Sequence, residues 1–322
     1  MSASSNVPDS SPRSEETEWI PDQFSNYAAA NRSRIERALS EYLPVSNAPS
    51  TERFNQAVQS AVFPGGKRLR PLLSLIASDV GGASEVQALR ISCAVEFIHT
   101  SSLIMDDLPS MDDAELRRNQ PALHNVFGEG IAVLTSVALL NQAYLLFAES
   151  PENDVQTERL PRLFREVAGC VGHSGMIAGQ AVELALSGAV PDDAVLSTRA
   201  LKTTSLMRLG LTAGGIISGA PDEDIAALAT YGEYLGGAYQ IFDDLADSSS
   251  DHQTTGKSAG QDLRHLRPTM IRGLTPTEVR KLGAEVVESG KHSLARFGDH
   301  PGAKLLKSAA DHIVGGFSVS TS

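Results

Sequence analysis

The chain of 322 residues is poor in cysteine and has no excess of positive charge. Its two cysteines, Cys93 and Cys170, lie far apart in apolar stretches, which excludes a disulfide framework and a cysteine zinc site. We therefore expect a reducing, cytoplasmic setting. Lys and Arg number 27 against 39 Asp and Glu, and the formal net charge of −12 argues against nucleic acid as a partner.

The sequence also lacks the marks of secretion, membrane insertion and division into domains. Residues 1–20 are rich in Ser, Pro and acids and hold no apolar core of a signal peptide, so we expect a disordered N-terminal tail. Polar residues interrupt the longest apolar stretch, Ile131 to Ala148, which favours a buried helix over a membrane span. Because no fixed-period repeat or long linker follows residue 20, we expect one domain over residues 21–322.

Apolar residues recur at helical spacing in block after block, as at Leu72 and Ile76, whereas alternating strand patterns are scarce. Proline and glycine punctuate these blocks. Pro71 suits the first turn of a helix, and Gly81-Gly82 suits its end. We therefore predict an all-α fold, built as a single large helical bundle.

An acidic cluster stands out in residues 103–118, which read LIMDDLPSMDDAELRR. Its four acids are Asp106, Asp107, Asp112 and Asp113. His99 lies seven residues before Asp106 and shares its helix face, and Pro109 should break the helix so that Asp112 folds back beside Asp106. Taken alone, such a cluster is most often a solvated helix end.

A second acidic cluster, in YQIFDDLAD, changes that interpretation. Gln240, Asp243 and Asp247 share one helix face, and the cluster opens from the apolar stretch 235–242. Burying carboxylates without partners is costly, and a metal ion would offset the cost. Carboxylates without nearby Cys or His ligands suit Mg²⁺, whose shell a substrate phosphate completes. The two clusters therefore predict Mg²⁺ ions shared with a phosphorylated ligand.

The segment GGKRLRP, residues 65–71, is a candidate anion site because its glycine turn brings Lys67 and Arg70 to the start of a helix. It is not a P-loop, since Arg68 follows Lys67, and alone it is equally well explained as surface charge. Further cations are Arg117, Arg118, Lys202 and Lys257. Cations gathered beside acids in a protein of negative net charge favour an anionic ligand.

Four motifs in this order resemble those of the trans-isoprenyl diphosphate synthases, the polyprenyl synthetase family. They are GGKRLRP, DDLPSMDD followed by RR, LKTTSLM, and YQIFDDLAD followed by TGKSAGQD. The resemblance covers roughly residues 26 to 317. It implies the all-α isoprenoid synthase fold, with a central cavity whose mouth carries both aspartate motifs. It also implies a homodimeric, Mg²⁺-dependent prenyltransferase that condenses isopentenyl diphosphate with an allylic diphosphate.

The resemblance also implies a role for each matching residue. The principal Mg²⁺ ligands would be Asp106, Asp112 and Asp243, with Asp107, Asp244 and Asp247 in support. The homoallylic isopentenyl diphosphate site would consist of Lys67, Arg70, His99 and Arg118. The allylic diphosphate site would consist of Arg117, Lys202 and Lys257. The allylic cation would be stabilised by groups near Lys202, Thr203 and Gln240.

Product length follows from the positions four and five residues before the first aspartate, which in this family help to set the cavity floor. Here they are Ser102 and Ser101, about 6 to 8 Å deeper along the helix than Asp106. Farnesyl-producing members often carry an aromatic residue there, whereas a small serine lets the chain grow. We therefore expect geranylgeranyl diphosphate, with farnesyl or a longer product as alternatives if other walls close the cavity.

The chain departs from the family pattern at Met105, at Asn119-Gln120 in place of the common Gly-Lys, and at Val137, Glu183 and Gln261. None of these removes a principal metal ligand, but cations usual at 120 and 261 are lost, which puts the affinity for diphosphate in question.

Two other protein classes remain as alternatives. A non-catalytic partner subunit commonly loses an aspartate motif, and a class I terpene cyclase lacks the second diphosphate site that Lys67 and Arg70 would form.

Overall fold

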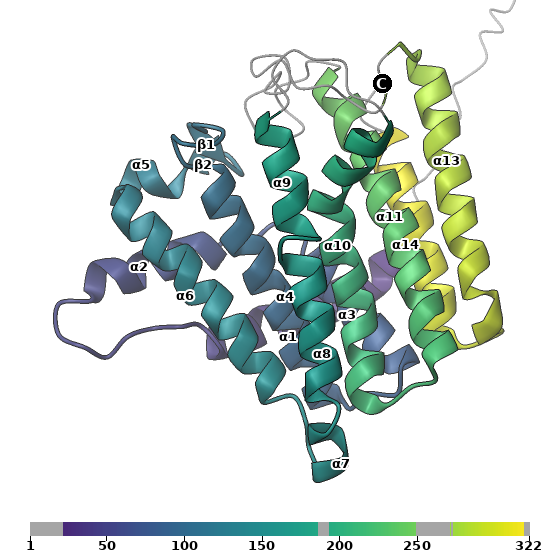
Figure 1. The fold of residues 1–322 in the computed structure, drawn as a ribbon, viewed down its shortest axis with the longest axis horizontal. Coiled ribbons are helices and arrows are strands. Elements are labelled where there is room, and N and C mark those ends of the chain that lie inside the picture. The colour runs from purple at the N-terminus through teal and green to yellow at the C-terminus, as the bar shows by residue number, and fades with distance from the viewer. Residues whose placement is uncertain (1–21, 186–192, 249–270, 272, 319–322) are drawn as a thin grey trace, which may run out of the picture.

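The computed structural model describes residues 22–185, 193–248, 271 and 273–318, which form a bundle of α-helices with one small hairpin (Figure 1). Its first elements are α1 (Gln23–Glu41), α2 (Glu52–Val62), α3 (Leu69–Val80), α4 (Glu85–Asp106), β1 (Leu116–Arg117), β2 (Gln120–Pro121), α5 (Leu123–Phe127) and α6 (Glu129–Ala148). They are followed by α7 (Asp154–Thr157), α8 (Leu160–Val171), α9 (Met176–Ala185), α10 (Asp193–Ser218), α11 (Asp222–Ser248), α13 (Pro276–Ser293), the 3₁₀ helix η1 (Leu294–Phe297) and α14 (Pro301–Ser318). The prediction of an all-α fold is confirmed. The predicted disordered tail, residues 1–20, lies outside the described residues, and the division into a tail and one domain stays a prediction.

Local signals in the sequence set the ends of the helices that carry the motifs. Ser84 begins α4 with a capping box, in which its hydroxyl accepts from the Gln87 amide at 3.3 Å and the Gln87 side chain accepts from the Ser84 amide at 2.9 Å. The other end of α4 lies at Asp106, before Pro109, as the proline predicts. The first aspartate motif therefore begins on the last turn of a long, well-capped helix.

The hydrophobic core lies between the central helices of the bundle. Phe97 of α4, Leu209 of α10 and both Tyr231 and Phe242 of α11 are almost completely buried in one apolar cluster. Burying a side chain of this size contributes about 1.5 to 3 kcal/mol. The core therefore holds together the three helices on which most of the predicted site residues lie.

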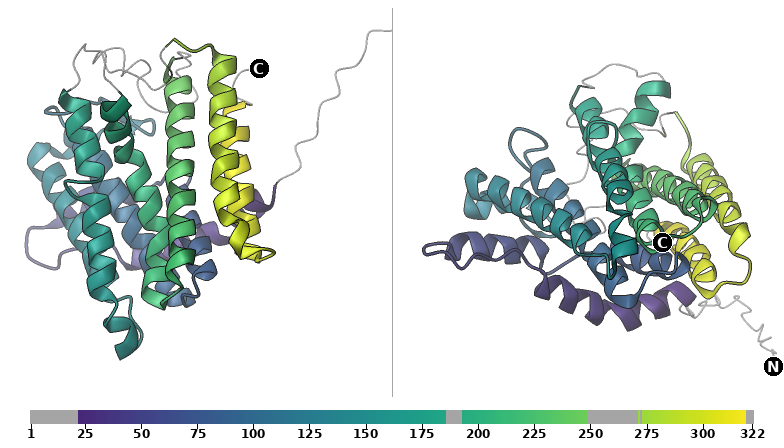
Figure 2. Two further views of the ribbon diagram at one scale, coloured as in Figure 1. Left: turned by 45° about the vertical axis from the view of Figure 1, so that its right-hand side comes forward. Right: turned by 60° about the horizontal axis from the view of Figure 1, so that its bottom comes forward.

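Two glycines allow α10 and α11 to pack backbone against backbone. A Cβ atom at Gly236 would lie 2.7 Å from the Thr204 Cα, and one at Gly232 would lie 2.9 Å from the Arg208 Cα. The pairing of Thr204 with Gly236 and of Arg208 with Gly232 makes the two helices antiparallel, as Figure 2 shows. The C-terminal half of α11 therefore lies beside the N-terminal half of α10, which brings Gln240 near the segment that carries Lys202.

Helix α6 forms one edge of the bundle, beside α2 and α5 (Figures 1 and 2). The sequence predicts a buried helix, and this prediction is wrong for one face. Leu139 and Ser136 are buried, but Leu134 and Val137 are 57% and 56% exposed. By length and composition alone, α4 and α6 are both apolar enough to cross a membrane. Most of the apolar segment of α4 is buried inside the protein, whereas less than half of that of α6 is buried. An uncovered apolar stripe therefore runs along α6.

Candidate active site

The first aspartate motif folds back on the end of α4. The Asp112 amide donates to the Asp106 carbonyl at 2.9 Å, so the predicted return of the chain after Pro109 is confirmed. Both aspartates are buried, with 7% and 8% of their surface exposed. The pKa of Asp106 is raised, chiefly by burial. The positive charge of Lys202 acts to lower this pKa, whereas the negative charges of Asp112 and Glu183 act to raise it. The motif thus holds negative charge in a place that water reaches poorly.

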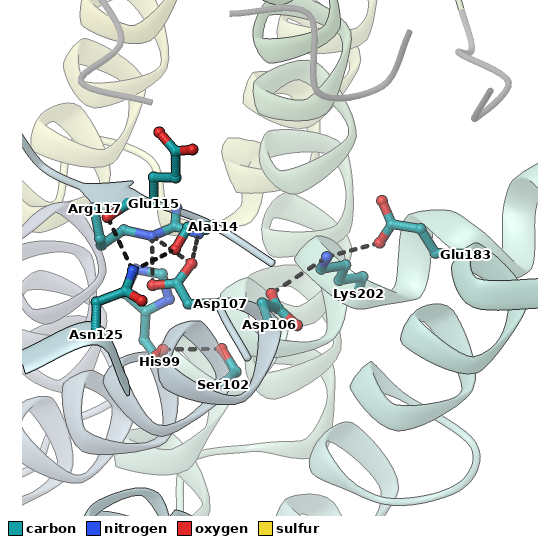
Figure 3. A network of polar contacts seen from close by, with 10 residues as sticks. All are labelled: His99, Ser102, Asp106, Asp107, Ala114, Glu115, Arg117, Asn125, Glu183 and Lys202. Atoms are coloured by element: carbon teal, nitrogen blue, oxygen red, sulfur yellow. Dashed lines mark hydrogen bonds and ion pairs between the residues drawn. The ribbon is translucent and has the colours of Figure 1, made fainter. Parts of the chain in front are cut away.

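Lys202 of α10 connects this motif to α9. Its Nζ lies 3.2 Å from Asp106 Oδ2 and 2.7 Å from Glu183 Oε2 (Figure 3). Burial alone would lower the pKa of Lys202, but the charges of Asp106 and Glu183 outweigh burial and raise it. Glu183 is a site residue that the sequence analysis missed. The signal that could have identified Glu183 was its departure from the family pattern, which the sequence shows.

Arg117 lies on the hairpin that follows the motif and pairs with Asp107. Its Nε donates to both carboxylate oxygens of Asp107, at 3.0 and 3.1 Å, and its Nη2 makes a further bond (Figure 3). Arg118 and Asn119 form the two-residue turn, with φ values of 54° and 60°. Asn tolerates this left-handed conformation better than most residues. The chain therefore keeps the turn although Asn replaces the glycine that is common after the two arginines.

The cations at the start of α3 bring the second motif to the same region. Arg70 donates to His99 Nε2 of α4 at 3.2 Å, which makes that ring nitrogen the acceptor. Burial lowers the pKa of Arg70, while the nearby charges of Tyr239, Glu96 and Asp243 act to raise it. Asp243 of α11 therefore lies within electrostatic reach of a cation that contacts α4. Arg70 therefore links the second acidic cluster electrostatically to α4, the helix on whose last turn the first cluster begins.

The other predicted residues fall into three groups. Lys67 is exposed and lines a pocket of about 140 Å³ with Arg32 of α1 and Leu72 of α3. Thr203 is half-buried next to Lys202, and Asp244 is buried. Lys257 and the side chain of Asp247 lie outside the described residues.

Ser101 and Ser102 face different surroundings. The Ser101 hydroxyl lies 2.8 Å from that of Ser136 on α6, which in turn donates to the Ser101 carbonyl at 3.0 Å. Ser102 donates to the His99 carbonyl at 2.8 Å within α4. Ser101 is therefore packed against α6, and its partner Ser136 is a residue that the sequence analysis did not name. No spacing rule connects positions 101 and 136, because the contact comes from the packing of two helices.

The buried polar atoms that lack a hydrogen-bond partner among the described residues include Arg70 Nε, Gln180 Oε1 and Gln240 Oε1. Gln180 was not predicted, and its amide nitrogen contacts Met111 Sδ at 3.6 Å. Buried polar groups are normally paired, so these atoms have hydrogen-bonding capacity that the described residues do not use. The Gln240 side-chain oxygen therefore has no partner among the described residues, and its place beside the allylic group stays a prediction.

The residues present fit a hard divalent cation. The described residues contain no ready group of three His, Cys, Asp or Glu side chains at metal-binding distances. However, Asp106 and Asp112 are both buried, the charge of Asp112 adds to the raised pKa of Asp106, and a cation would relieve this repulsion. Oxygen donors without thiolate or imidazole partners suit Mg²⁺. The aspartate motif is thus chemically suited to the predicted metal.

Comparison with known proteins gives the same classification. The family model described as polyprenyl synthetase matches residues 51–281. A chloroplastic geranylgeranyl pyrophosphate synthase of Arabidopsis thaliana is 34% identical over 89% of this chain and 80% of its own. A farnesyl diphosphate synthase of Bacillus subtilis is 35% identical over 78% of this chain and 84% of its own. The chain therefore belongs to the polyprenyl synthetase family, and the prediction of a trans-prenyltransferase is confirmed.

Solved structures of similar proteins share the fold. An FPP/GFPP synthase from Zymomonas mobilis superposes with a TM-score of 0.76 at 32% identity, covering 90% of this chain and 98% of that one. A polyprenyl synthase from Caulobacter crescentus, complexed with calcium and isoprenyl diphosphate, gives a TM-score of 0.75 at 26% identity, covering 90% of this chain and 96% of that one. These likenesses extend over nearly the whole chain, so the isoprenoid synthase fold is confirmed.

Proposed function

We propose that this prenyltransferase condenses isopentenyl diphosphate with an allylic diphosphate, in a Mg²⁺-dependent reaction, to give geranylgeranyl diphosphate. The observation that carries the proposal is that each acidic motif has a cation beside it and that the helices carrying the motifs pack on α10. Asp106 and Asp112 are buried beside Lys202, and Asp243 lies near Arg70, which contacts His99. Such a site binds charged diphosphates through both cations and metal.

The proposed metal ligands are Asp106, Asp112 and Asp243, supported by Asp107, Asp244 and Asp247. Bound there, Mg²⁺ would supply positive charge against the diphosphate that leaves the allylic substrate. Lys202 and Arg117, with Lys257, hold the same diphosphate and add charge where it develops. Lys202 is held by two acids and Arg117 by Asp107, so both cations are already oriented before the substrate binds.

The second substrate is bound by Lys67, Arg70, His99 and Arg118. The allylic C–O bond breaks, and the electron pair leaves with the diphosphate. The double bond of isopentenyl diphosphate then forms the new C–C bond, and the departing diphosphate accepts the proton that is lost. Thr203 and the unpaired Gln240 Oε1 offer oxygen dipoles near the allylic cation without a strong nucleophile.

Relatives of both product types support a short-chain product, since they include a geranylgeranyl and a farnesyl diphosphate synthase. Ser101 and Ser136 together supply only two small side chains at the depth where an aromatic residue would end the chain. This favours the longer, geranylgeranyl product.

Purified protein incubated with farnesyl and isopentenyl diphosphates in Mg²⁺ buffer tests the proposal, with products identified by mass spectrometry. We expect geranylgeranyl diphosphate and its loss on addition of a chelator. If dimethylallyl, geranyl and farnesyl diphosphates are all left unchanged, the proposal is wrong. An inactive chain that activates a homologue would instead identify a non-catalytic subunit.

We also propose that a second copy of the chain covers α6. Its exposed stripe of Leu134, Val137 and Leu145 is apolar, and on one helix these positions fall on one face. Apolar stripes of this kind in soluble proteins usually mark protein interfaces. The two free, buried cysteines support a cytoplasmic setting for this dimer, because a reducing compartment keeps thiols unpaired.

The dimer is tested by light scattering after size-exclusion chromatography. Val137→Glu should convert a dimer to a monomer, because it places a charge in the middle of the apolar stripe. Val155→Glu is the matched control, since Val155 is 61% exposed on α7 and lies outside the stripe. A wild-type monomer, or a dimer that both variants leave intact, would contradict the proposed interface.

A further inference from the structure

Arg68 lies in the middle of the motif that carries Lys67 and Arg70, but its side chain points into the protein. It stands directly before α3 with a φ of 53°, a left-handed conformation that is unusual for a residue with a side chain. The side chain is completely buried, whereas Lys67 beside it is exposed. The left-handed backbone therefore separates one inward cation from its neighbours.

The buried guanidinium of Arg68 uses its donors on three parts of the chain. Nε and Nη2 donate to the two carboxylate oxygens of Glu36 on α1, at 3.0 and 3.1 Å. Nη1 donates to Glu96 Oε1 on α4 at 2.6 Å, and Nη2 also donates to the Val62 carbonyl at 2.7 Å. A planar, forked donor is needed to satisfy all of these acceptors at once. Arg68 therefore ties α1, α2 and α4 to the start of α3.

The glycine loop is wrapped around this guanidinium. A Cβ atom at Gly65 would overlap the Arg68 guanidinium, and the Phe63 ring lies 5.6 Å from its Cζ. At the next residue, a Cβ atom on Gly66 would lie 3.2 Å from Arg118 Nε. The two glycines are thus sandwiched between an inner arginine and an arginine of the predicted isopentenyl diphosphate site.

Glu96 is the shared counter-ion of this arrangement. Its side chain is 3% exposed, and it lies three residues before His99, on the same side of α4. Burial lowers the pKa of Arg118. The positive charges of Arg68 and Arg70 lower this pKa further, and the negative charge of Glu96 opposes the lowering. The same carboxylate opposes the lowering of the pKa of Arg70. One buried acid therefore offsets the repulsion among three neighbouring arginines.

We propose that Arg68 and Glu96 are positioning residues for the isopentenyl diphosphate site. Neither contacts the substrate in this arrangement. The pair fixes the loop that carries Lys67 and holds Arg70 and Arg118 close together before the diphosphate arrives. Because the pair joins this loop to the helix that carries His99, it sets the spacing of all four ligand groups. The inference rests on the proposed assignment of those four residues to isopentenyl diphosphate.

The test compares the KM for isopentenyl diphosphate with that for farnesyl diphosphate in Glu96→Gln, which keeps the shape and removes the charge. We expect the KM for isopentenyl diphosphate to rise about tenfold or more. The KM for farnesyl diphosphate and kcat at saturation should stay within about twofold, because Lys202 and Arg117 have other partners. Arg68→Lys, which retains the charge but not the forked geometry, should show the same split.

Glu166→Gln serves as the matched control. Glu166 accepts from Arg208 at 2.8 Å and from Thr212 at 3.3 Å between α8 and α10, away from the motifs. This variant should lower Tm and leave both KM values unchanged. If folded Glu96→Gln or Arg68→Lys leaves both KM values unchanged, or raises both equally, the inference is wrong. If Glu96→Gln does not fold, Arg68→Lys and Glu96→Asp decide by the same ratio. A wild-type protein that elongates no primer would overturn the proposed function itself, which separates that failure from this one.

Discussion

Replacing Ser101 with phenylalanine should shorten the product from geranylgeranyl to farnesyl diphosphate. Ser101 lies five residues before Asp106, so at about 1.5 Å per residue an added ring lies about 7.5 Å below the first aspartate. The ring must fit where the Ser101 hydroxyl now lies 2.8 Å from that of Ser136. Loss of this hydrogen bond costs about 1 kcal/mol, and overpacking costs about 1 to 3 kcal/mol. We therefore expect Tm to fall by roughly 4 to 10 °C in a protein that still folds.

Product analysis by mass spectrometry, with dimethylallyl and isopentenyl diphosphates as substrates, measures this effect. Ser101→Ala is the control, because it removes the same hydrogen bond without adding bulk. It should lower Tm by about 2 °C and leave the product length unchanged. If a folded Ser101→Phe enzyme still releases geranylgeranyl diphosphate, another wall sets the length and the argument from Ser101 is refuted.

Three further predictions concern charged and nucleophilic groups. Asp106→Asn should abolish turnover and leave Tm unchanged or higher. Because the pKa of Asp106 is raised in the folded protein, its ionised carboxylate lowers the free energy of unfolding at neutral pH. A clear fall in Tm would contradict this reasoning. Glu183→Gln removes one of the two acids that hold Lys202, so the KM for the allylic substrate should rise while that for isopentenyl diphosphate does not, and unchanged values for both would count against it. Burial raises the pKa of the Cys170 thiol to about 12 and also raises the pKa of Cys93. A thiol reagent should therefore modify neither cysteine at about pH 8 until guanidinium unfolds the protein. Rapid labelling of the native protein would show that the two thiols are not buried.

The sequence was sufficient for the fold class and for the return of Asp112 to Asp106, because both depend on local patterns. Helical spacing predicted α4, and the break at Pro109 predicted the return of Asp112 to Asp106. The order of motifs identified the family that the comparisons confirm. Each of these inferences needs only residues that are close in sequence or a characteristic series of short segments.

Contacts between distant helices were not predictable in this way. Ser136 and Ser101 are 35 residues apart, and Arg68 and Glu96 are 28 apart, with no periodic signal to join them. The direction of Arg68 also depends on a left-handed φ, which its side chain does not favour. The exposed face of α6 escaped prediction for another reason. Apolar composition does not distinguish a core helix from one that a second protein chain covers.

The central claim is that two aspartate motifs act together, through metal, on one diphosphate. Calorimetric binding of farnesyl diphosphate alone, with and without Mg²⁺, tests it most directly, since no turnover occurs without the second substrate. We predict that Mg²⁺ strengthens binding to the wild-type protein, and that Asp106→Asn and Asp243→Asn each abolish this metal-dependent gain. If either variant alone keeps the full gain, the two motifs do not share the metal-bound diphosphate and the account is contradicted.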